Sequence, residues 1–261
     1  MGKLQWDQTG ERFYETGVDQ GVLYLADGRG VPWNGLTAVD EASGNVNQTS
    51  YYIDGVRYFT QRSVGDYSAT LKAFTYPDEF MEFDGYQEAA DGLILDSQPV
   101  LNEFGLSYRT RVGNDIDGTD HGYKIHLAYH MTAVPSSRSF GTMGDSVDPM
   151  LFSWTISGTP EVLAGYRPTC HVIIDSRKVS PAMLAVVEEI LYGSDISDAR
   201  LPTLFELVDL LSTWAFGVVD NGNGTWTVRG PIENVKNLDK KTFMVDRTTV
   251  APNTNGYTVS S

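Results

Sequence analysis

Two segments near the middle of the chain alternate strictly between apolar and polar or small side chains. The first places Phe104, Leu106, Tyr108, Thr110 and Val112 on one face, against Gly105, Ser107, Arg109 and Arg111. In the second, Tyr123, Ile125, Leu127, Tyr129 and Met131 alternate with Lys124, His126, Ala128 and His130. A period of two is the signature of a β-strand with one buried and one exposed face. The pattern therefore predicts two strands, each with a well-specified register.

The ten residues between these segments are polar and acidic. They run from Gly113 to Gly122 and include Asp115, Asp117 and Asp120. A connection of this length exceeds a tight hairpin turn, and its charge disfavours burial. We therefore expect a projecting loop.

A hairpin is expected around residue 54. Tyr51-Tyr52-Ile53 and Val56-Arg57-Tyr58-Phe59 have the composition of short strands. The Asp54-Gly55 pair between them is a strong two-residue turn signal. Similar patterns predict further strands at residues 22–25, 33–39, 67–76, 152–157 and 170–174.

Two helices are predicted after these strands. Ser180 is a candidate N-cap, with Pro181 in the first turn and Gly193 at the end. Thr203 and Glu206 have the spacing of a capping box at the start of the second helix. A hairpin at 214–229 and a strand near 242–245 are expected to follow.

These elements predict a mainly β protein, an antiparallel β-sandwich or strongly curved sheet with one or two flanking α-helices. Residues 1–213 are expected to form the main domain. Residues 214–261 form a C-terminal hairpin extension that either belongs to this domain or lies outside it.

The charge of the chain restricts its partners. Its 261 residues carry a formal net charge of −15, which disfavours binding to nucleic acid or to an anionic membrane surface. Solubility alone accounts for such a charge, but an acidic wall would also let DNA slide past without sticking. The single cysteine, Cys170, permits no intrachain disulfide and is expected to be buried. We see no secretory signal and no membrane-spanning run, so synthesis in the cytoplasm is expected.

The acidic string at Asp115, Asp117 and Asp120 raises the question of a metal site. It does not match the ligand positions of an EF-hand, which leaves a looser calcium site as a minor alternative to a solvated loop or an intersubunit salt bridge. His126 and His130 are two pleats apart, roughly 13 Å on a strand, too far for a zinc ion held by this pair alone. No other metal site and no cofactor are expected.

Catalysis is not predicted. Glu79, Glu82 and Asp84 could suggest paired carboxylates for acid–base work, but a solvated rim is the favoured interpretation. The sequence also lacks the nucleophile-elbow, metalloprotease, phosphate-loop and CxxC motifs. The chain is therefore not expected to be an enzyme.

A family resemblance rests on a shared order of short strings. They are GVLYLADGRGVPWNGLTAV, YYIDGVRY, YPDEFMEFDG, FGLSYRTRVGNDIDGTDHGYKIHLAYH, PSSRSFGTM, FSWTISGTP and ILYGSD. In these strings the chain resembles the major tail tube proteins of long, non-contractile-tailed (siphovirus-like) bacteriophages of actinobacteria. The resemblance covers most of residues 1 to about 215 and weakens beyond them.

This resemblance implies a structural virion protein, made in the host cytoplasm and located in the phage tail. Such proteins assemble into hexameric rings that stack into a hollow tube, through which viral DNA passes during ejection. The implied partners are other copies of the chain, a tape measure protein, and tail terminator and tail tip proteins, with no membrane involved. The implied contact segment between rings is Asp40–Ser63, and an ordinary surface loop is the alternative for this segment. Candidate inter-ring or intersubunit residues are Trp6, Asp40, Asn45, Tyr51, Asp54, Arg57, Asp115, Asp117 and Asp120.

A different class of function stays open at this point. Fourteen tyrosines, five tryptophans and the acidic loop would also suit a carbohydrate-binding β-sandwich with a loop calcium site. A hydrolase that uses Glu79 or Glu82 is the third alternative.

Overall fold

The computed structural model describes most of the chain from residue 4 to residue 250. The described residues are 4–42, 47–63, 67–96, 102–142, 149–212, 217–220, 226–229, 235–237, 243–245 and 248–250. The chain divides into two compact units, one of residues 1–179 with 190–201 and one of residues 180–189 with 202–261. The domain boundary expected at 213/214 lies outside the described residues, so it stays a prediction.

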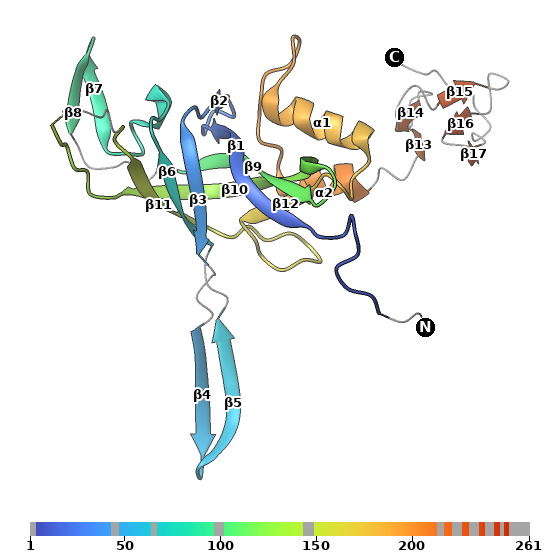
Figure 1. Cartoon of the computed structure of the whole chain (residues 1–261), viewed down its shortest axis with the longest axis horizontal. Coiled ribbons are helices and arrows are strands. Elements are labelled where there is room, and N and C mark those ends of the chain that lie inside the picture. Colours follow the sequence, from blue (N-terminus) through green and yellow to red (C-terminus); the bar gives the residue numbers. More distant parts are fainter. Residues whose placement is uncertain are drawn as a thin grey trace. The chain divides into compact units, whose positions relative to one another are not determined.

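The first unit is built on an eight-stranded sheet (Figure 1). Its order is β2-β1-β9-β10-β11-β6-β3, and β12 pairs with β10. All of these pairings are antiparallel. The strands are β1 (Tyr14–Tyr24), β2 (Gly30–Pro32), β3 (Leu36–Ala42), β6 (Ser68–Ala73), β9 (Phe104–Asn114), β10 (Gly118–Pro135), β11 (Phe152–Gly158) and β12 (His171–Asp175). A short 3-10 helix, η1 (Asp78–Phe80), follows β6.

The sheet is strongly curved. Tyr108 on β9 donates a hydrogen bond to the carboxylate of Glu41 on β3, although β10, β11 and β6 lie between these strands in the sheet order. Tyr67, just before β6, also lies 3.3 Å from the Tyr108 hydroxyl. Such contacts require the two ends of the sheet to bend toward each other. The fold class predicted from the sequence, mainly antiparallel β with two helices, is confirmed.

The concave side encloses an aromatic core. Trp154 and Phe80 are fully buried and meet edge to face at 5.3 Å between ring centroids. Phe104 packs on Phe80 at 5.5 Å, and Trp33 packs on it at 4.6 Å. Edge-to-face geometry favours the contact of the positive ring edge with the negative ring face. The core therefore joins strands from both ends of the sheet with the loop that carries η1.

The central strand β10 is buried on both faces, which corrects the expectation of one buried and one exposed face. Ile125 and Leu127 are buried as predicted, but His126 and Ala128 on the opposite face are buried too. The reason is that the curved sheet covers this second face: Tyr108 stacks on His126, and Ala128 belongs to the core on the concave side.

A bulge near His130 changes the face of the residues that follow. The register with β9 shifts between Ala128 and Met131, and His130 has a positive φ of 51°. Met131 therefore joins Ala128 in the concave core rather than continuing the face of Tyr129. A strict period of two placed Met131 wrongly, because one inserted residue reverses the alternation.

The β9–β10 connection is much shorter than the projecting loop that the sequence suggested. The strands continue to Asn114 and resume at Gly118, which leaves three residues in the turn. The Asn114 side chain accepts hydrogen bonds from the N–H groups of Ile116 and Asp117, at 3.1 and 2.5 Å, and Gly118 has a φ of 62°. These hydrogen bonds close the turn within three residues. The charged residues on either side can therefore lie at the ends of the two strands, which is why the charge of this segment wrongly suggested a long loop.

Two small hairpins form separate two-stranded sheets. They are β4 (Asn47–Ile53) with β5 (Val56–Ser63), and β7 (Tyr86–Ala90) with β8 (Leu93–Asp96). The predicted hairpin at Asp54-Gly55 is confirmed and is longer than its apolar residues suggested.

The helices begin where the capping signals predicted. In α1 (Pro181–Tyr192) the Ser180 hydroxyl accepts from the Met183 N–H at 3.4 Å, and Gly193 follows with a φ of 79°. In α2 (Leu204–Ser212) the Thr203 hydroxyl accepts from the Glu206 N–H at 3.1 Å. None of the described helices has the length and apolarity needed to cross a bilayer.

The C-terminal strands belong to the second unit. β13 (Gly217–Asp220) pairs with β14 (Trp226–Arg229), as predicted. β15 (Val235–Asn237), β16 (Phe243–Val245) and β17 (Thr248–Val250) form a three-stranded sheet. The expected strand near 242–245 is β16.

Candidate functional site

The β4–β5 hairpin is the first candidate, because it presents an apolar surface that the rest of the described chain leaves uncovered. Its two-residue turn has positive φ at both Asp54 (49°) and Gly55 (77°), as a type I′ turn requires. Tyr51 pairs with Phe59, and Ile53 pairs with Val56. Paired residues and residues two apart share a face, so these four side chains lie together.

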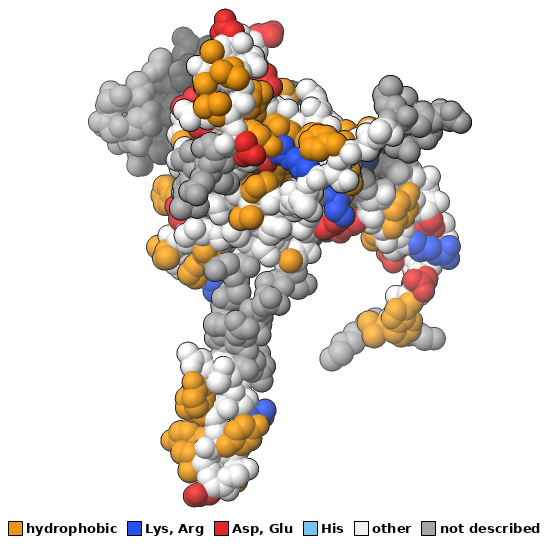
Figure 2. Space-filling view, turned by 90° about the vertical axis from the view of Figure 1, so that its left-hand side faces the viewer, with side chains coloured by type: hydrophobic (Ala, Val, Ile, Leu, Met, Phe, Trp, Pro, Cys, Tyr) orange, Lys and Arg blue, Asp and Glu red, His pale blue; other side chains and the backbone are white. Residues whose placement is uncertain are grey.

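This apolar face is exposed to solvent. The exposed fractions are 45% for Tyr51, 55% for Ile53, 70% for Val56 and 49% for Phe59. The Tyr51 and Phe59 rings stack at 4.6 Å, so the face is ordered within the hairpin itself. Figure 2 shows hydrophobic side chains exposed on the hairpin toward the lower end of the view. Isolated two-stranded hairpins are marginally stable in water, and an apolar face of this kind gains stability when another surface covers it.

The opposite face of the hairpin is mixed. Tyr52 pairs with Arg57, and the register shifts beside this pair so that Tyr58 has no opposing residue. All three side chains are exposed. The hairpin therefore offers apolar contact on one face and aromatic, cationic and hydrogen-bonding groups on the other.

The structure brings together some of the predicted contact residues and separates others. Tyr51, Asp54 and Arg57 share the hairpin. Asp40 lies on β3, where it pairs with Lys72 at 2.7 Å, and Trp6 lies in the N-terminal segment with 73% of its surface exposed. Asn45 lies outside the described residues.

The three loop aspartates do not converge on one point. Asp115 accepts from the Gly10 N–H at 2.9 Å, and Asp117 contacts His121 Nδ1 at 2.9 Å. Asp120 lies 3.7 Å from Arg111. Each carboxylate thus has its own partner in the chain, and the arrangement gives no support to a shared calcium ion.

The basic residues of β9 and β10 are neutralised within the chain. Arg109 binds both carboxylate oxygens of Asp19, at 2.6 and 3.0 Å, and Arg111 binds the same carboxylate at 2.9 Å. Lys124 pairs with Glu15. Burial raises the pKa of Asp19, but the hydrogen bonds from the two arginines outweigh it and hold the pKa below its usual value. These cations therefore form no free basic patch for DNA.

A polar cluster of one exposed carboxylate and two imidazoles joins three strands and was missed from the sequence. Glu41 on β3, His126 on β10 and His171 on β12 approach one another, with Tyr67 stacked on His171 and Tyr108 stacked on His126. The hydrogen bond from His126 lowers the pKa of Glu41 to about 2. Burial lowers the pKa of His171 to about 4, so its ring is neutral at pH 7. The strand pattern had assigned His126 to an exposed face, and nothing in the sequence linked it to residues 45 or more positions away.

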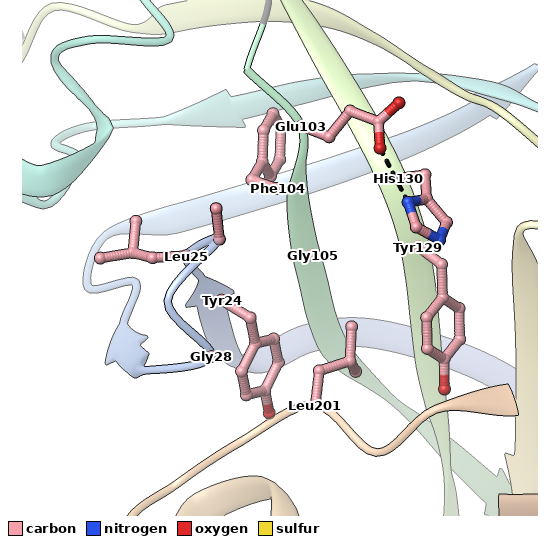
Figure 3. A pocket seen from close by; sticks show the side chains of 10 residues that line it. Tyr24, Leu25, Gly28, Glu103, Phe104, Gly105, Tyr129, His130 and Leu201 are labelled. Carbon is pink, nitrogen blue, oxygen red and sulfur yellow. Dashed lines mark hydrogen bonds and ion pairs between the residues drawn. The ribbon is translucent and has the colours of Figure 1, made fainter. Parts of the chain in front are cut away.

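An open hollow of about 330 Å3 lies beside the bulge, lined by residues from β1, β9 and β10 and the following loops (Figure 3). His130 Nδ1 lies 2.7 Å from Glu103 Oε2 at its rim, and both side chains are nearly half exposed. The Tyr24 hydroxyl, which could otherwise face a ligand, donates to the Leu191 carbonyl at 2.8 Å. The described lining contains no Ser, Cys or Lys, and the contact between His130 and Glu103 at its rim is open to solvent.

The predicted acidic rim also needs correction at Asp84. Its carboxylate is completely buried, accepts from Trp154 Nε1 at 2.7 Å and pairs with Arg138. It therefore acts as a polar support of the core. Glu79 lies 3.8 Å from Arg29 and is not part of this arrangement.

Comparisons with known proteins returned distant structural likenesses. No protein-family model and no curated protein matches the chain. A chain of the sheath-tube complex of an extracellular contractile injection system (PVC) matches 60% of this chain and 88% of its own, with 14% identity and a TM-score of 0.32. The tube-terminating cap of the anti-feeding prophage matches 67% and 96%, with 13% identity and a TM-score of 0.33. At these scores and identities the likenesses assign no role to this chain.

Proposed function

We propose that this chain is a structural subunit that assembles into rings, and that the rings stack into the tube of a phage-tail-like particle. The exposed apolar face of the β4–β5 hairpin carries this proposal. The sequence resemblance to tail tube proteins supports it, since it implies that the segment Asp40–Ser63 reaches an adjacent ring. On this proposal the hairpin docks onto a second copy of the chain.

The energetics of the hairpin favour cooperative assembly. Burying the exposed part of a large apolar side chain contributes about 1 kcal/mol, so four such side chains contribute about 4 kcal/mol per hairpin. Association of two free molecules costs roughly 4–15 kcal/mol, so one hairpin would not hold two monomers together. A ring that presents several hairpins at once meets this cost once and gains every contact. Assembly should therefore have a sharp concentration threshold.

Ring closure would use the sheet edges. In the described part of the main sheet, β3 and β12 each pair with one neighbour only, so each has a backbone edge available, whereas the Gly30 N–H of β2 already donates to the Ala199 carbonyl. Such edges pair readily with another chain. The sheet could thus continue from one subunit to the next, and the stacked rings would follow from the hairpins.

The charge is compatible with a conduit for DNA. Six copies at −15 each, the ring number that the resemblance implies, would carry −90. The pairing of Arg109, Arg111 and Lys124 with acidic partners removes the basic groups that would otherwise attract phosphate. On this proposal the chain acts without enzymatic activity, and its further partners are tape measure, tail terminator and tail tip proteins.

The test is negative-stain electron microscopy over a concentration series, with light scattering on the same samples. The wild-type protein should form hollow rings or tubes above a threshold concentration. In the variant Ile53→Ser/Val56→Ser, which removes a cross-strand apolar pair from the hairpin, that threshold should rise at least about tenfold, since the loss of two such contacts is worth about 2 kcal/mol.

The matched control is Val162→Ser, which removes an exposed valine (76%) outside the hairpin and should leave the threshold unchanged. Circular dichroism should show the same fold for all three proteins. A wild-type protein that stays monomeric at every concentration, or a hairpin variant that assembles like the wild type, would overturn the proposal.

A further inference from the structure

Three potential metal ligands meet where the curved sheet closes on itself. Glu41 comes from β3, His126 from the middle of β10 and His171 from the first residue of β12. All three belong to the first unit. His126 is 5% exposed and His171 is largely buried, whereas Glu41 borders solvent. The site is thus enclosed on the side of the imidazoles and open on the side of the carboxylate.

The distances between the donor atoms match those around a small divalent ion. Nδ1 of His126 lies 3.2 Å from Oε1 of Glu41 and 3.3 Å from Nε2 of His171. Nε2 of His171 lies 3.7 Å from the same Glu41 oxygen. Ligands of a tetrahedral zinc ion, bound at about 2.0–2.1 Å, lie about 3.3–3.4 Å from one another. A point near the plane of these three atoms is about 2.0 Å from each of them, so an ion fits without a large movement of any strand.

The two imidazoles face each other through these nitrogens. Their ring centroids are 5.4 Å apart, and the two nitrogens are 3.3 Å apart, so the nitrogens lie between the rings. The other nitrogen of His126, Nε2, lies 3.0 Å from the hydroxyl of Thr110. If Nε2–H donates to Thr110, the lone pair of Nδ1 is directed at the cluster. A hydrogen bond of this kind on the far nitrogen is the usual support for a metal-binding histidine.

Aromatic residues hold the ligands in place. Tyr108 stacks on His126 at 4.6 Å and Tyr67 stacks on His171 at 4.4 Å, and Tyr108 also donates to Glu41. Without a cation, an unprotonated Nδ1 would face both a carboxylate oxygen and a second imidazole nitrogen, which is unfavourable. A metal ion bound by these three donor atoms would remove this repulsion by accepting all three lone pairs.

We propose that Glu41, His126 and His171 bind one divalent transition-metal ion, zinc or an ion of similar preference, with water completing the coordination. Two imidazoles and one carboxylate are a donor set that suits such ions. The ion would fasten β3 to β10 and β12. Because β3 precedes β4 in the order of the chain, the ion would also anchor the strand before the hairpin, but the metal site stands whether or not the chain forms a tube.

The first experiment measures metal content and stability on the untagged full-length protein. After stripping with EDTA and dialysis against zinc, elemental analysis should find one ion per chain. At a free zinc concentration of about one hundred times Kd, the melting temperature should rise by about 5–10 °C above that of the stripped protein. Replacing zinc with cobalt in the wild-type protein should give the intense visible absorption of a four-coordinate ion. This measurement tests the site without any substitution in the chain.

Variants locate the ion. Glu41→Gln and His171→Ala should each weaken zinc binding at least tenfold and abolish the cobalt spectrum. His130→Ala is the matched control, because His130 is also a histidine beside carboxylates, with Glu103 at 2.7 Å, but lies outside the cluster. It should bind zinc like the wild type.

Three results would overturn the proposal: no ion retained by the wild-type protein, an unchanged affinity in Glu41→Gln, or a loss of binding in His130→Ala. If His171→Ala fails to fold, Glu41→Gln decides, because its exposed and isosteric side chain leaves the core intact.

Discussion

Replacing Asp84 with alanine should strongly destabilise the first unit. The Asp84 carboxylate has no exposed surface, and it holds two partners: the buried Trp154 indole N–H at 2.7 Å and the partly buried Arg138 guanidinium. Trp154 is at the centre of the aromatic core and is itself fully buried. Alanine would leave the buried indole donor without a partner and would remove the carboxylate that neutralises Arg138, which keeps its hydrogen bond to the Tyr86 hydroxyl at 2.8 Å.

The magnitude follows from burial. Removing one member of a buried ion pair costs about 3–5 kcal/mol, because the other charge is left uncompensated. Arg138 retains 17% side-chain exposure and lies over the Tyr86 ring at 4.9 Å, so it can partly turn to solvent. We therefore expect a loss of about 3–4 kcal/mol in the free energy of unfolding, or about 6–15 °C in melting temperature. Asp84→Asn keeps an acceptor for the indole and should cost less, about 1–2 kcal/mol.

The assay is urea unfolding followed by circular dichroism, with calorimetry to confirm the melting temperatures. The matched control is Asp40→Ala, because Asp40 also accepts from a cation at close range, Lys72 at 2.7 Å, but both side chains are exposed. Loss of this exposed pair should cost no more than about 1 kcal/mol in the free energy of unfolding. A double-mutant cycle of Asp84→Ala with Arg138→Met should give a coupling energy of at least about 2 kcal/mol. An Asp84→Ala protein no less stable than Asp40→Ala would refute the reasoning.

Two further predictions concern the central strands. Asp19→Asn should lower the free energy of unfolding by about 0.5–1 kcal/mol at pH 7, because the charged Asp19 binds both Arg109 and Arg111. The pKa of Asp19 is lowered in the folded state, so the stability difference between wild type and Asp19→Asn should be complete above about pH 4, the ordinary pKa of aspartate. The difference should shrink as the pH falls through the pKa that Asp19 has in the folded protein. Chemical denaturation at pH 7 and at pH 3 measures it, and a difference that does not change with pH would contradict the prediction. Gly113→Ala should cost about 1–3 kcal/mol in thermal unfolding, because a Cβ there would lie 2.5 Å from the Gly118 carbonyl oxygen, whereas Gly141→Ala meets nothing within 4 Å and should be neutral.

The sequence by itself determined the elements of this protein. Alternation of period two located most of the long strands but not the short β2 and the β7–β8 hairpin, Asp54-Gly55 located the hairpin turn, and Ser180 and Thr203 located the starts of both helices. These signals are reliable because each depends on contacts between residues close in sequence: a turn, a cap or the side-chain direction along one strand. The exposed apolar hairpin was likewise accessible from the sequence, since its strands are neighbours.

Only the tertiary structure decided what the strands enclose. Curvature of the sheet brings Glu41 to His126 and His171, and places Asp84 beneath Trp154, which is 70 residues away. The bulge at His130 reversed a face that strict alternation had assigned. Pairings of this kind depend on how distant strands are arranged in space, and a polar residue on a strand has the same local pattern whether its face meets water or another part of the sheet.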